Sequence, residues 1–97
     1  MIQLEPQHLE IVKRILKQLL PQCKALVFGS RVTLQFKPHS DLDLCIVGAK
    51  PLALSQLAML REAFSASDLP MRVDIVVWST LTPEFQEIIE KNSVLIV

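Results

Sequence analysis

The sequence between residues 25 and 44, ALVFGSRVTLQFKPHSDLDL, contains the pattern that decides the fold. A short apolar run ends at the pair Gly29-Ser30, and ten intervening residues separate this pair from Asp41. Asp41 and Asp43 then open a second apolar run. Short apolar runs bounded by glycine or polar residues are typical of buried strands. The stretch therefore predicts two strands joined by a polar loop.

A third apolar run, Val73 to Trp78, is interrupted by Asp74. A carboxylate in a buried strand is costly unless a partner neutralises it, and these runs contain no basic residue of their own. Residues two apart on a strand share a face, so Asp41 and Asp43 point the same way. If the strand of Asp74 is their neighbour, the three carboxylates converge. Oxygen ligands of this kind favour a hard divalent cation such as Mg²⁺.

The Gly-Ser pair and its neighbour have groups that suit a phosphate. Gly29 would let the backbone approach a ligand closely, and Ser30 offers a hydroxyl and an N–H. Arg31 would add a planar cation. Each feature also has a simpler interpretation: Gly29-Ser30 as a turn, Asp74 as a strand-edge residue bonded to backbone, and Arg31 as a solvated loop residue. These separate interpretations do not explain why all of these features occur together and in this order.

The remaining periodicity predicts a single α+β domain with a small mixed sheet and about three helices. Apolar residues at helical spacing predict a first helix between Pro6 and Pro21 and a second over 53–64. Thr82-Pro83 resembles an N-cap followed by a first-turn proline of a third helix. Strands are expected over 25–28, 42–47, 72–78 and, as a last short strand, 93–97.

Composition excludes several classes of protein. Apolar residues make up 51% of the 97 residues, so we expect an ordered single domain. Ten basic and ten acidic residues cancel, which argues against general nucleic-acid binding. We see no secretory signal and no apolar stretch near the ~20 residues of a membrane span, so we expect a cytoplasmic protein without a membrane partner. Cys23 and Cys45 are expected to be small buried residues of a reducing compartment.

The motifs Gly29-Ser30-Arg31, Ser40-Asp41-Leu42-Asp43-Leu44 and Arg72-Val73-Asp74, with their spacing, resemble the signature of the polymerase-β-type nucleotidyltransferase superfamily. The short members of this superfamily are the minimal nucleotidyltransferases, which are often encoded beside a helical HEPN-type protein. The resemblance implies that Asp41 and Asp43 bind two metal ions and that Asp74 completes the catalytic site. It also implies that Gly29 and Ser30 hold the triphosphate, with Arg31 and Ser40 as further nucleotide-binding candidates.

The function implied by this resemblance is Mg²⁺-dependent transfer of a nucleoside monophosphate, AMP from ATP in the best-understood pairing, to a hydroxyl of the HEPN partner. This chain would then be an antitoxin. The alternative is a nucleotide-binding module that neutralises its partner without catalysis. Modification of a small molecule such as an antibiotic is a weaker third hypothesis, because the chain has no room for an acceptor-holding domain. Leu34 and Phe36 replace the glycine and small residue frequent in this loop, and we expect them to be covered by the domain itself, by a partner or by self-association.

Overall fold

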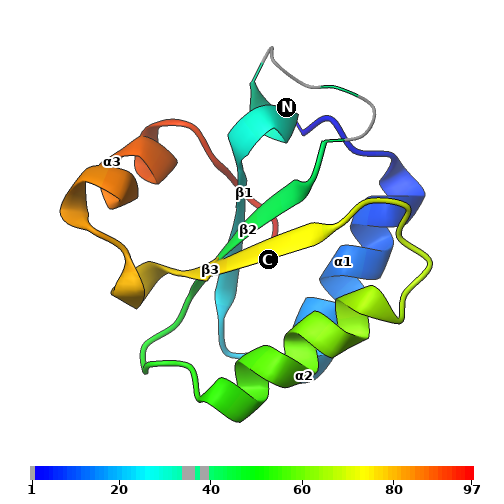
Figure 1. Cartoon of the computed structure of the whole chain (residues 1–97), viewed down its shortest axis with the longest axis horizontal. Coiled ribbons are helices and arrows are strands. Elements are labelled where there is room, and N and C mark those ends of the chain that lie inside the picture. The colour runs from blue at the N-terminus through cyan, green and yellow to red at the C-terminus, as the bar shows by residue number, and fades with distance from the viewer. Residues whose placement is uncertain (1, 34–36, 38–39) are drawn as a thin grey trace.

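The structure, a computed structural model of the chain, describes residues 2–33, 37 and 40–97. Three α-helices and four strands alternate along these residues, with two short 3₁₀ helices (Figure 1). In chain order they are α1 (Pro6–Leu19), β1 (Lys24–Phe28), η1 (Gly29–Val32), β2 (Leu42–Val47), α2 (Leu54–Ser65), β3 (Val73–Val77), η2 (Trp78–Thr80), α3 (Pro83–Lys91) and β4 (Val94–Leu95). The predicted α+β class with three helices and a small sheet is confirmed.

The sheet is mixed, with the strand order β3-β2-β1-β4. Strand β1 is antiparallel to both β2 and β4, whereas β2 and β3 are parallel. The carboxyl end of β1 and the amino ends of β2 and β3 therefore lie at one end of the sheet (Figure 1). This end is where the sequence motifs meet.

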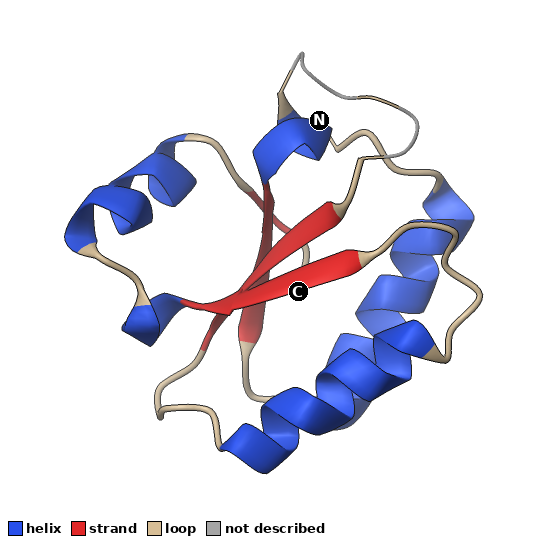
Figure 2. Ribbon diagram, viewed as in Figure 1, coloured by secondary structure: helices blue, strands red, loops and turns tan. Residues whose placement is uncertain are grey.

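Helices α1 and α2 lie together on one side of the strands (Figure 2). Pro6 starts α1 at a position where its missing N–H costs nothing, and Leu20 caps the other end. Alternate strand residues point toward these helices, so the core combines one stripe of each helix with one face of the sheet. Its fully buried members include Val12, Leu16, Val27, Leu42, Leu44, Ile46 and Leu60.

Helix α3 lies on the other side of the strands, separate from α1 and α2 (Figure 1). The Thr82 side chain accepts a hydrogen bond from the Phe85 N–H at 3.2 Å, which confirms the predicted N-cap. Gln86 Nε2 donates to the Trp78 carbonyl at 2.8 Å and joins α3 to the end of β3. This bond ties the start of α3 to the carboxyl end of β3, whereas Asp74 lies near the amino end of the same strand.

Three details differ from the sequence expectation. The chain folds into 3₁₀ turns directly after β1 and β3, and the last strand spans only Val94–Leu95 rather than 93–97. Cys45 is buried as expected, but Cys23 is partly exposed. Leu34 and Phe36 lie outside the described residues, so the prediction that something covers them stays a prediction. In the described part of the chain, no helix is both long and apolar enough to cross a membrane.

Candidate active site

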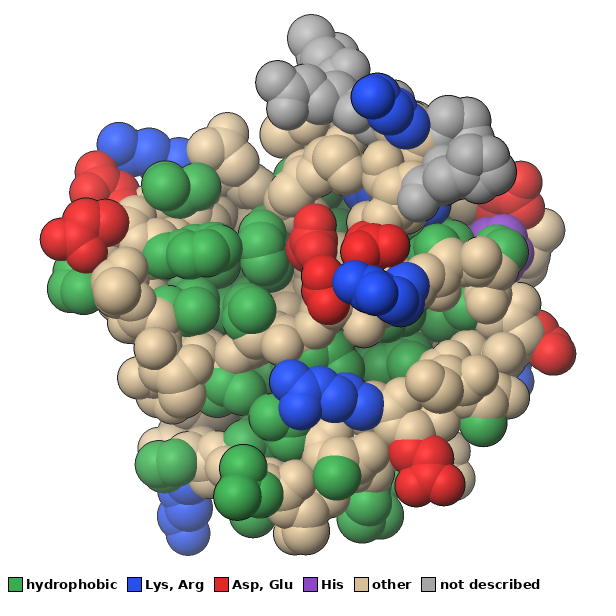
Figure 3. Space-filling view, viewed as in Figure 1, with side chains coloured by type: hydrophobic (Ala, Val, Ile, Leu, Met, Phe, Trp, Pro, Cys, Tyr) green, Lys and Arg blue, Asp and Glu red, His purple; other side chains and the backbone are tan. Residues whose placement is uncertain are grey.

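Two of the predicted aspartates, Asp43 and Asp74, are adjacent at the end of the sheet where β2 and β3 begin, and Asp41 directly precedes β2. Asp43 of β2 is in register with Asp74 of β3 and with Phe28 of β1. The neighbouring Leu42 N–H donates to the Arg72 carbonyl at 2.9 Å, so the parallel pairing begins just before the aspartates. Acidic side chains gather on this face in Figure 3. The prediction that the strands of Asp43 and Asp74 are neighbours is confirmed.

The charges of Asp41 and Asp74 act on the carboxyl group of Asp43. Partial burial of Asp43, together with the charges of Asp74 and Asp41, raises the pKa of Asp43 to about 6. Burial is the largest cause, and like-charge repulsion adds to it. A carboxyl with this pKa is half protonated near pH 6, and a nearby cation would favour its charged form.

Asp41 has a protein partner that the sequence analysis missed. Arg72 Nη2 lies 3.4 Å from Asp41 Oδ2, and both side chains are substantially exposed. The partner could have been found by extending the strand register: Leu42 opposes Val73, so the preceding residues, Asp41 and Arg72, are adjacent as well. The apolar runs contain no basic residue, but Arg72, just before the third run, supplies a counter-charge to Asp41.

Gly29 has a use that differs from the predicted one. Its φ of +79° is in the region that favours glycine. A Cβ at this position would overlap Asp43 Oδ2. The missing side chain thus makes room for the carboxylate of Asp43, whereas the sequence analysis assigned the space to a ligand. The backbone turn at Gly29 sets the position of both Ser30 and Asp43.

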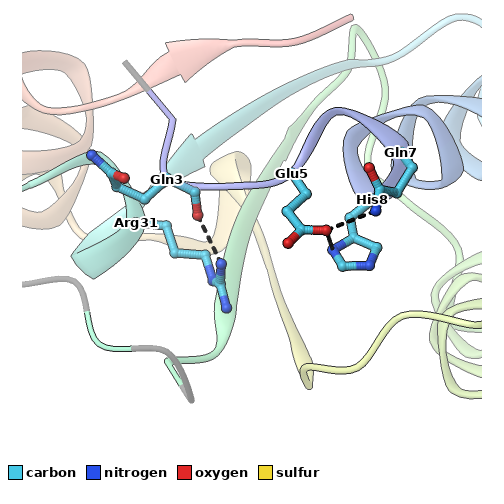
Figure 4. Close-up of polar contacts among 5 residues, drawn as sticks. All are labelled: Gln3, Glu5, Gln7, His8 and Arg31. Atoms are coloured by element: carbon cyan, nitrogen blue, oxygen red, sulfur yellow. Dashed lines mark hydrogen bonds and ion pairs between the residues drawn. The ribbon is translucent and has the colours of Figure 1, made fainter.

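The structure contradicts the interpretation of Arg31 as a solvated loop residue, since the residue is 4% exposed. Its predicted role in nucleotide binding stays a prediction. The guanidinium Nη1 donates to the Gln3 carbonyl at 2.7 Å (Figure 4), and Nε and Nη2 donate to the Ser40 carbonyl at 3.1 and 2.8 Å. The Gln3 N–H returns a bond to the Arg31 carbonyl. Arg31 therefore joins the N-terminal segment to the residue before Asp41.

The two serines lie on either side of the site. Ser30 is in the 3₁₀ turn after Gly29, and its carbonyl accepts from the Thr33 N–H and hydroxyl. The Ser40 hydroxyl accepts from the Lys37 N–H at 3.1 Å, while the Ser40 N–H donates to the Lys37 carbonyl. These bonds make Ser40 a turn residue that positions Asp41. The predicted role of Ser30 in holding phosphate stays a prediction.

The donor set fits a divalent cation by its chemistry. Carboxylate oxygens are the ligands that Mg²⁺ takes in proteins, and the repulsion at Asp43 is what such an ion relieves. Within the described ranges, however, no three acidic, cysteine or histidine side chains are already placed around one point. The ion pair of Asp41 with Arg72 accounts for part of this, because it draws one carboxylate to a neighbour.

Two hollows flank the carboxylates. One, of about 560 Å³, is lined by apolar residues that include Phe28, Phe85 and Ile88, and it reaches Gly29. The other, of about 460 Å³, contains Arg61, Arg72 and Asp74. None of Phe28, Phe85 or Arg61 was singled out from sequence, because each belongs to an element whose contacts are set by the tertiary fold.

Residues 10–97 match the profile described as "Polymerase beta, Nucleotidyltransferase". The chain belongs to this family. It is a nucleotidyltransferase of the minimal type, as the motifs predicted. A curated relative from Haemophilus influenzae, named probable protein adenylyltransferase MntA, is 46% identical over 95 residues, which cover 98% of this chain and 83% of the relative.

Solved structures share the fold. A toxin–antitoxin complex crystallised with AMP-PNP matches with a TM-score of 0.77 and 19% identity over 92% of this chain and 72% of the other. A tri-AMPylated HEPN toxin of Shewanella oneidensis in complex with its MNT antitoxin matches with a TM-score of 0.72 and 17% identity, over 94% and 70% of the two chains. Spectinomycin adenyltransferase from Enterococcus matches at 0.59 and 21%, over 92% of this chain but 47% of that enzyme. At these identities the likeness shows the fold.

Proposed function

We propose that this protein transfers AMP from ATP to a hydroxyl group of a HEPN-type partner protein and thereby acts as an antitoxin. The observation that carries the proposal is the register of Asp43 with Asp74 beside the Gly29-Ser30 turn. The relative from Haemophilus influenzae, which bears the name of a protein adenylyltransferase, supports the reaction class. The AMPylated toxin bound to a structurally similar antitoxin supports the partner class.

The residues have separate tasks in this reaction. The backbone N–H groups and hydroxyl at Ser30 hold phosphate oxygens, because a tight turn after a strand presents such donors outward. Asp41, Asp43 and Asp74 would hold the divalent ions, which neutralise the triphosphate and the charge that develops during transfer. Asp74, the most exposed of the aligned pair, is placed to accept the proton of the acceptor hydroxyl.

The transfer itself is a displacement at the α-phosphorus. The acceptor oxygen forms a bond to phosphorus as the bond to the bridging oxygen breaks, pyrophosphate leaves, and the hydroxyl proton passes to Asp74. Positioning and charge stabilisation supply most of the rate in chemistry of this kind. A chain with few other polar groups at the site can therefore suffice.

The second candidate function is a nucleotide-binding module that inhibits its partner by complex formation alone. That hypothesis depended on Leu34 and Phe36, which lie outside the described residues. The paired Asp41 and Arg72 are a separate observation in its favour, because one predicted metal ligand is engaged before any ion binds.

One experiment separates the two functions. The chain is incubated with ATP, Mg²⁺ and a purified HEPN-type partner protein, and the intact masses of both proteins are measured. We expect the partner, and not this chain, to gain the mass of one or more AMP groups. The Asp74→Asn variant should give no adduct while still binding the partner. Inhibition of the partner by the wild-type chain with no adduct from any of the four nucleotides would overturn the transferase and establish the binding module.

A further inference from the structure

The hollow between β1 and α3 lies directly beside the carboxylates. Gly29 contributes to its wall, and the same residue leaves the space that Asp43 fills. Phe28, which precedes Gly29, is in register with Asp43 on the neighbouring strand. A molecule in this hollow is therefore next to the carboxylates and continuous with the turn at Ser30.

The lining of the hollow is neutral and aromatic. Among the described residues, seven line it, and none of these has an acidic, basic or histidine side chain. The rings of Phe28 and Phe85 are perpendicular, at 86°, with centroids 5.9 Å apart. One ring can stack on a flat ligand while the other contacts its edge, an arrangement that aromatic quadrupoles favour. The side chains of Thr33 and Asn92 add a polar rim.

Part of this lining is exposed although it is apolar. Phe85 is 40% exposed and Ile88 60% exposed, on a helix whose remaining surface is mainly polar. Hydrophobic side chains gather over α3 and extend toward the acidic group in Figure 3. Exposed apolar surface that adjoins a polar site is typical of ligand-binding hollows, which combine an apolar wall with a few polar groups.

We propose that this hollow, walled by Phe28, Phe85 and Ile88, binds the base of the donor nucleotide. The proposal rests on the proposed function, which places the triphosphate at Ser30. The base is the flat, uncharged part of the nucleotide, and the volume of about 560 Å³ falls within the usual range for small-molecule sites. The second hollow, which Asp74 itself lines, differs in having the charged side chains of Arg61 and Arg72 in its wall.

The test compares two ligands that share a triphosphate but differ in the base. Binding of AMP-PNP and of inorganic tripolyphosphate, each with Mg²⁺, is measured by calorimetry for the wild type, Phe85→Ala and Ile88→Ser. Both variants should bind AMP-PNP roughly tenfold more weakly, the usual scale for the loss of one stacking or apolar contact to a base, and tripolyphosphate unchanged. The control Leu54→Ser removes an equally apolar side chain, 86% exposed on α2, and should change neither affinity.

Each outcome has one meaning. Unchanged AMP-PNP affinity in both variants would overturn the base site, and a concurrent loss of partner binding would assign the hollow to the partner. An equal loss for both ligands would overturn it as well, because the effect would then lie in the triphosphate site. If the wild type bound neither ligand, the proposed function itself would fail. Ile88 is too exposed for Ile88→Ser to unfold the chain, so the comparison stands even if Phe85→Ala does not fold.

Discussion

Gly29 has no side chain at the point where the carboxylate of Asp43 lies, so the turn after β1 and the acidic residue of β2 fit together as one unit. The turn also has a φ of +79°, which side chains with a Cβ rarely adopt. Both constraints apply to the same residue. The glycine of the predicted phosphate turn is therefore required by the protein itself before any ligand binds.

The first prediction concerns Gly29→Ala. The added Cβ must displace Asp43 and must hold a left-handed backbone, so we expect a loss of about 1–3 kcal/mol in the free energy of unfolding together with loss of AMP transfer. Urea unfolding and the intact-mass assay measure the two effects. Gly48→Ala is the control: its Cβ would lie 3.0 Å from Cys23 Sγ, outside the site and without a positive φ. Equal effects of the two substitutions would contradict the fit between Gly29 and Asp43.

The second prediction concerns Arg31→Lys. A lysine keeps the charge but cannot donate to both the Gln3 and Ser40 carbonyls from a planar group. The substitution should lower the free energy of unfolding by about 2–3 kcal/mol, because buried carbonyls lose charged donors. The rate of AMP transfer should also fall, because less of the protein is folded and because Asp41 is displaced. A variant of wild-type stability with weaker nucleotide binding would instead support the phosphate role that the sequence predicted for Arg31.

The outcome at Arg31 shows what the sequence could not supply. Its neighbours are polar and it follows a turn, so local pattern predicts a solvated or ligand-binding cation. Its burial depends on Gln3, which is 28 residues away in the sequence, and no periodicity links the two. Strand alternation, by contrast, depends only on local geometry, which is why the burial of Leu42 and Leu44 on the face opposite Asp43 was predictable.

The site was predictable to the extent that it follows from strand register. Asp43 and Asp74 are adjacent because their strands pair in parallel, and the apolar runs around them predicted those strands. The ring pair Phe28–Phe85, by contrast, depends on how α3 packs against the sheet, which no local pattern predicts. Self-association likewise stays a prediction, although Leu95 at the outer strand β4 is 56% exposed.

The third prediction is a pH dependence of stability that originates at Asp43. The pKa of Asp43 is about 6 in the folded chain against an ordinary 3.8, so the folded state binds this proton more tightly than the unfolded state. In EDTA, the free energy of unfolding should therefore fall as the pH rises from about 4 to about 6, and stay lower above it. The partly exposed carboxyl is expected to contribute about 1–2 kcal/mol after allowance for solvent screening.

The measurement for Asp43 is urea unfolding at about pH 5 and about pH 7.5, compared between the wild type and Asp43→Asn. The asparagine cannot ionise, so the variant should be as stable as the wild type or more stable at the higher pH and should lack this part of the pH dependence. Transfer should be abolished. A variant that is less stable than the wild type at both values would show that the carboxylate is structural, and the like-charge account of the site would be wrong.

The last prediction concerns the pair Asp41–Arg72. Both side chains are exposed, at 40% and 77%, so the ion pair contributes little to stability, and Arg72→Gln should change the free energy of unfolding by no more than about 0.5 kcal/mol. The Arg72→Gln substitution should affect metal binding more than it affects stability. Removing Arg72 frees the Asp41 carboxylate and takes a positive charge from the edge of the site, and both changes favour a cation. Calorimetric titration with Mn²⁺ in the absence of nucleotide should show binding several-fold tighter than in the wild type.

Arg61→Gln is the matched control, since Arg61 lines the same hollow as Arg72 but has no ion pair among the described residues. Its effect on Mn²⁺ binding should be clearly smaller than that of Arg72→Gln. Weaker Mn²⁺ binding in Arg72→Gln would mean that Arg72 orients Asp41 for the metal rather than competing with it.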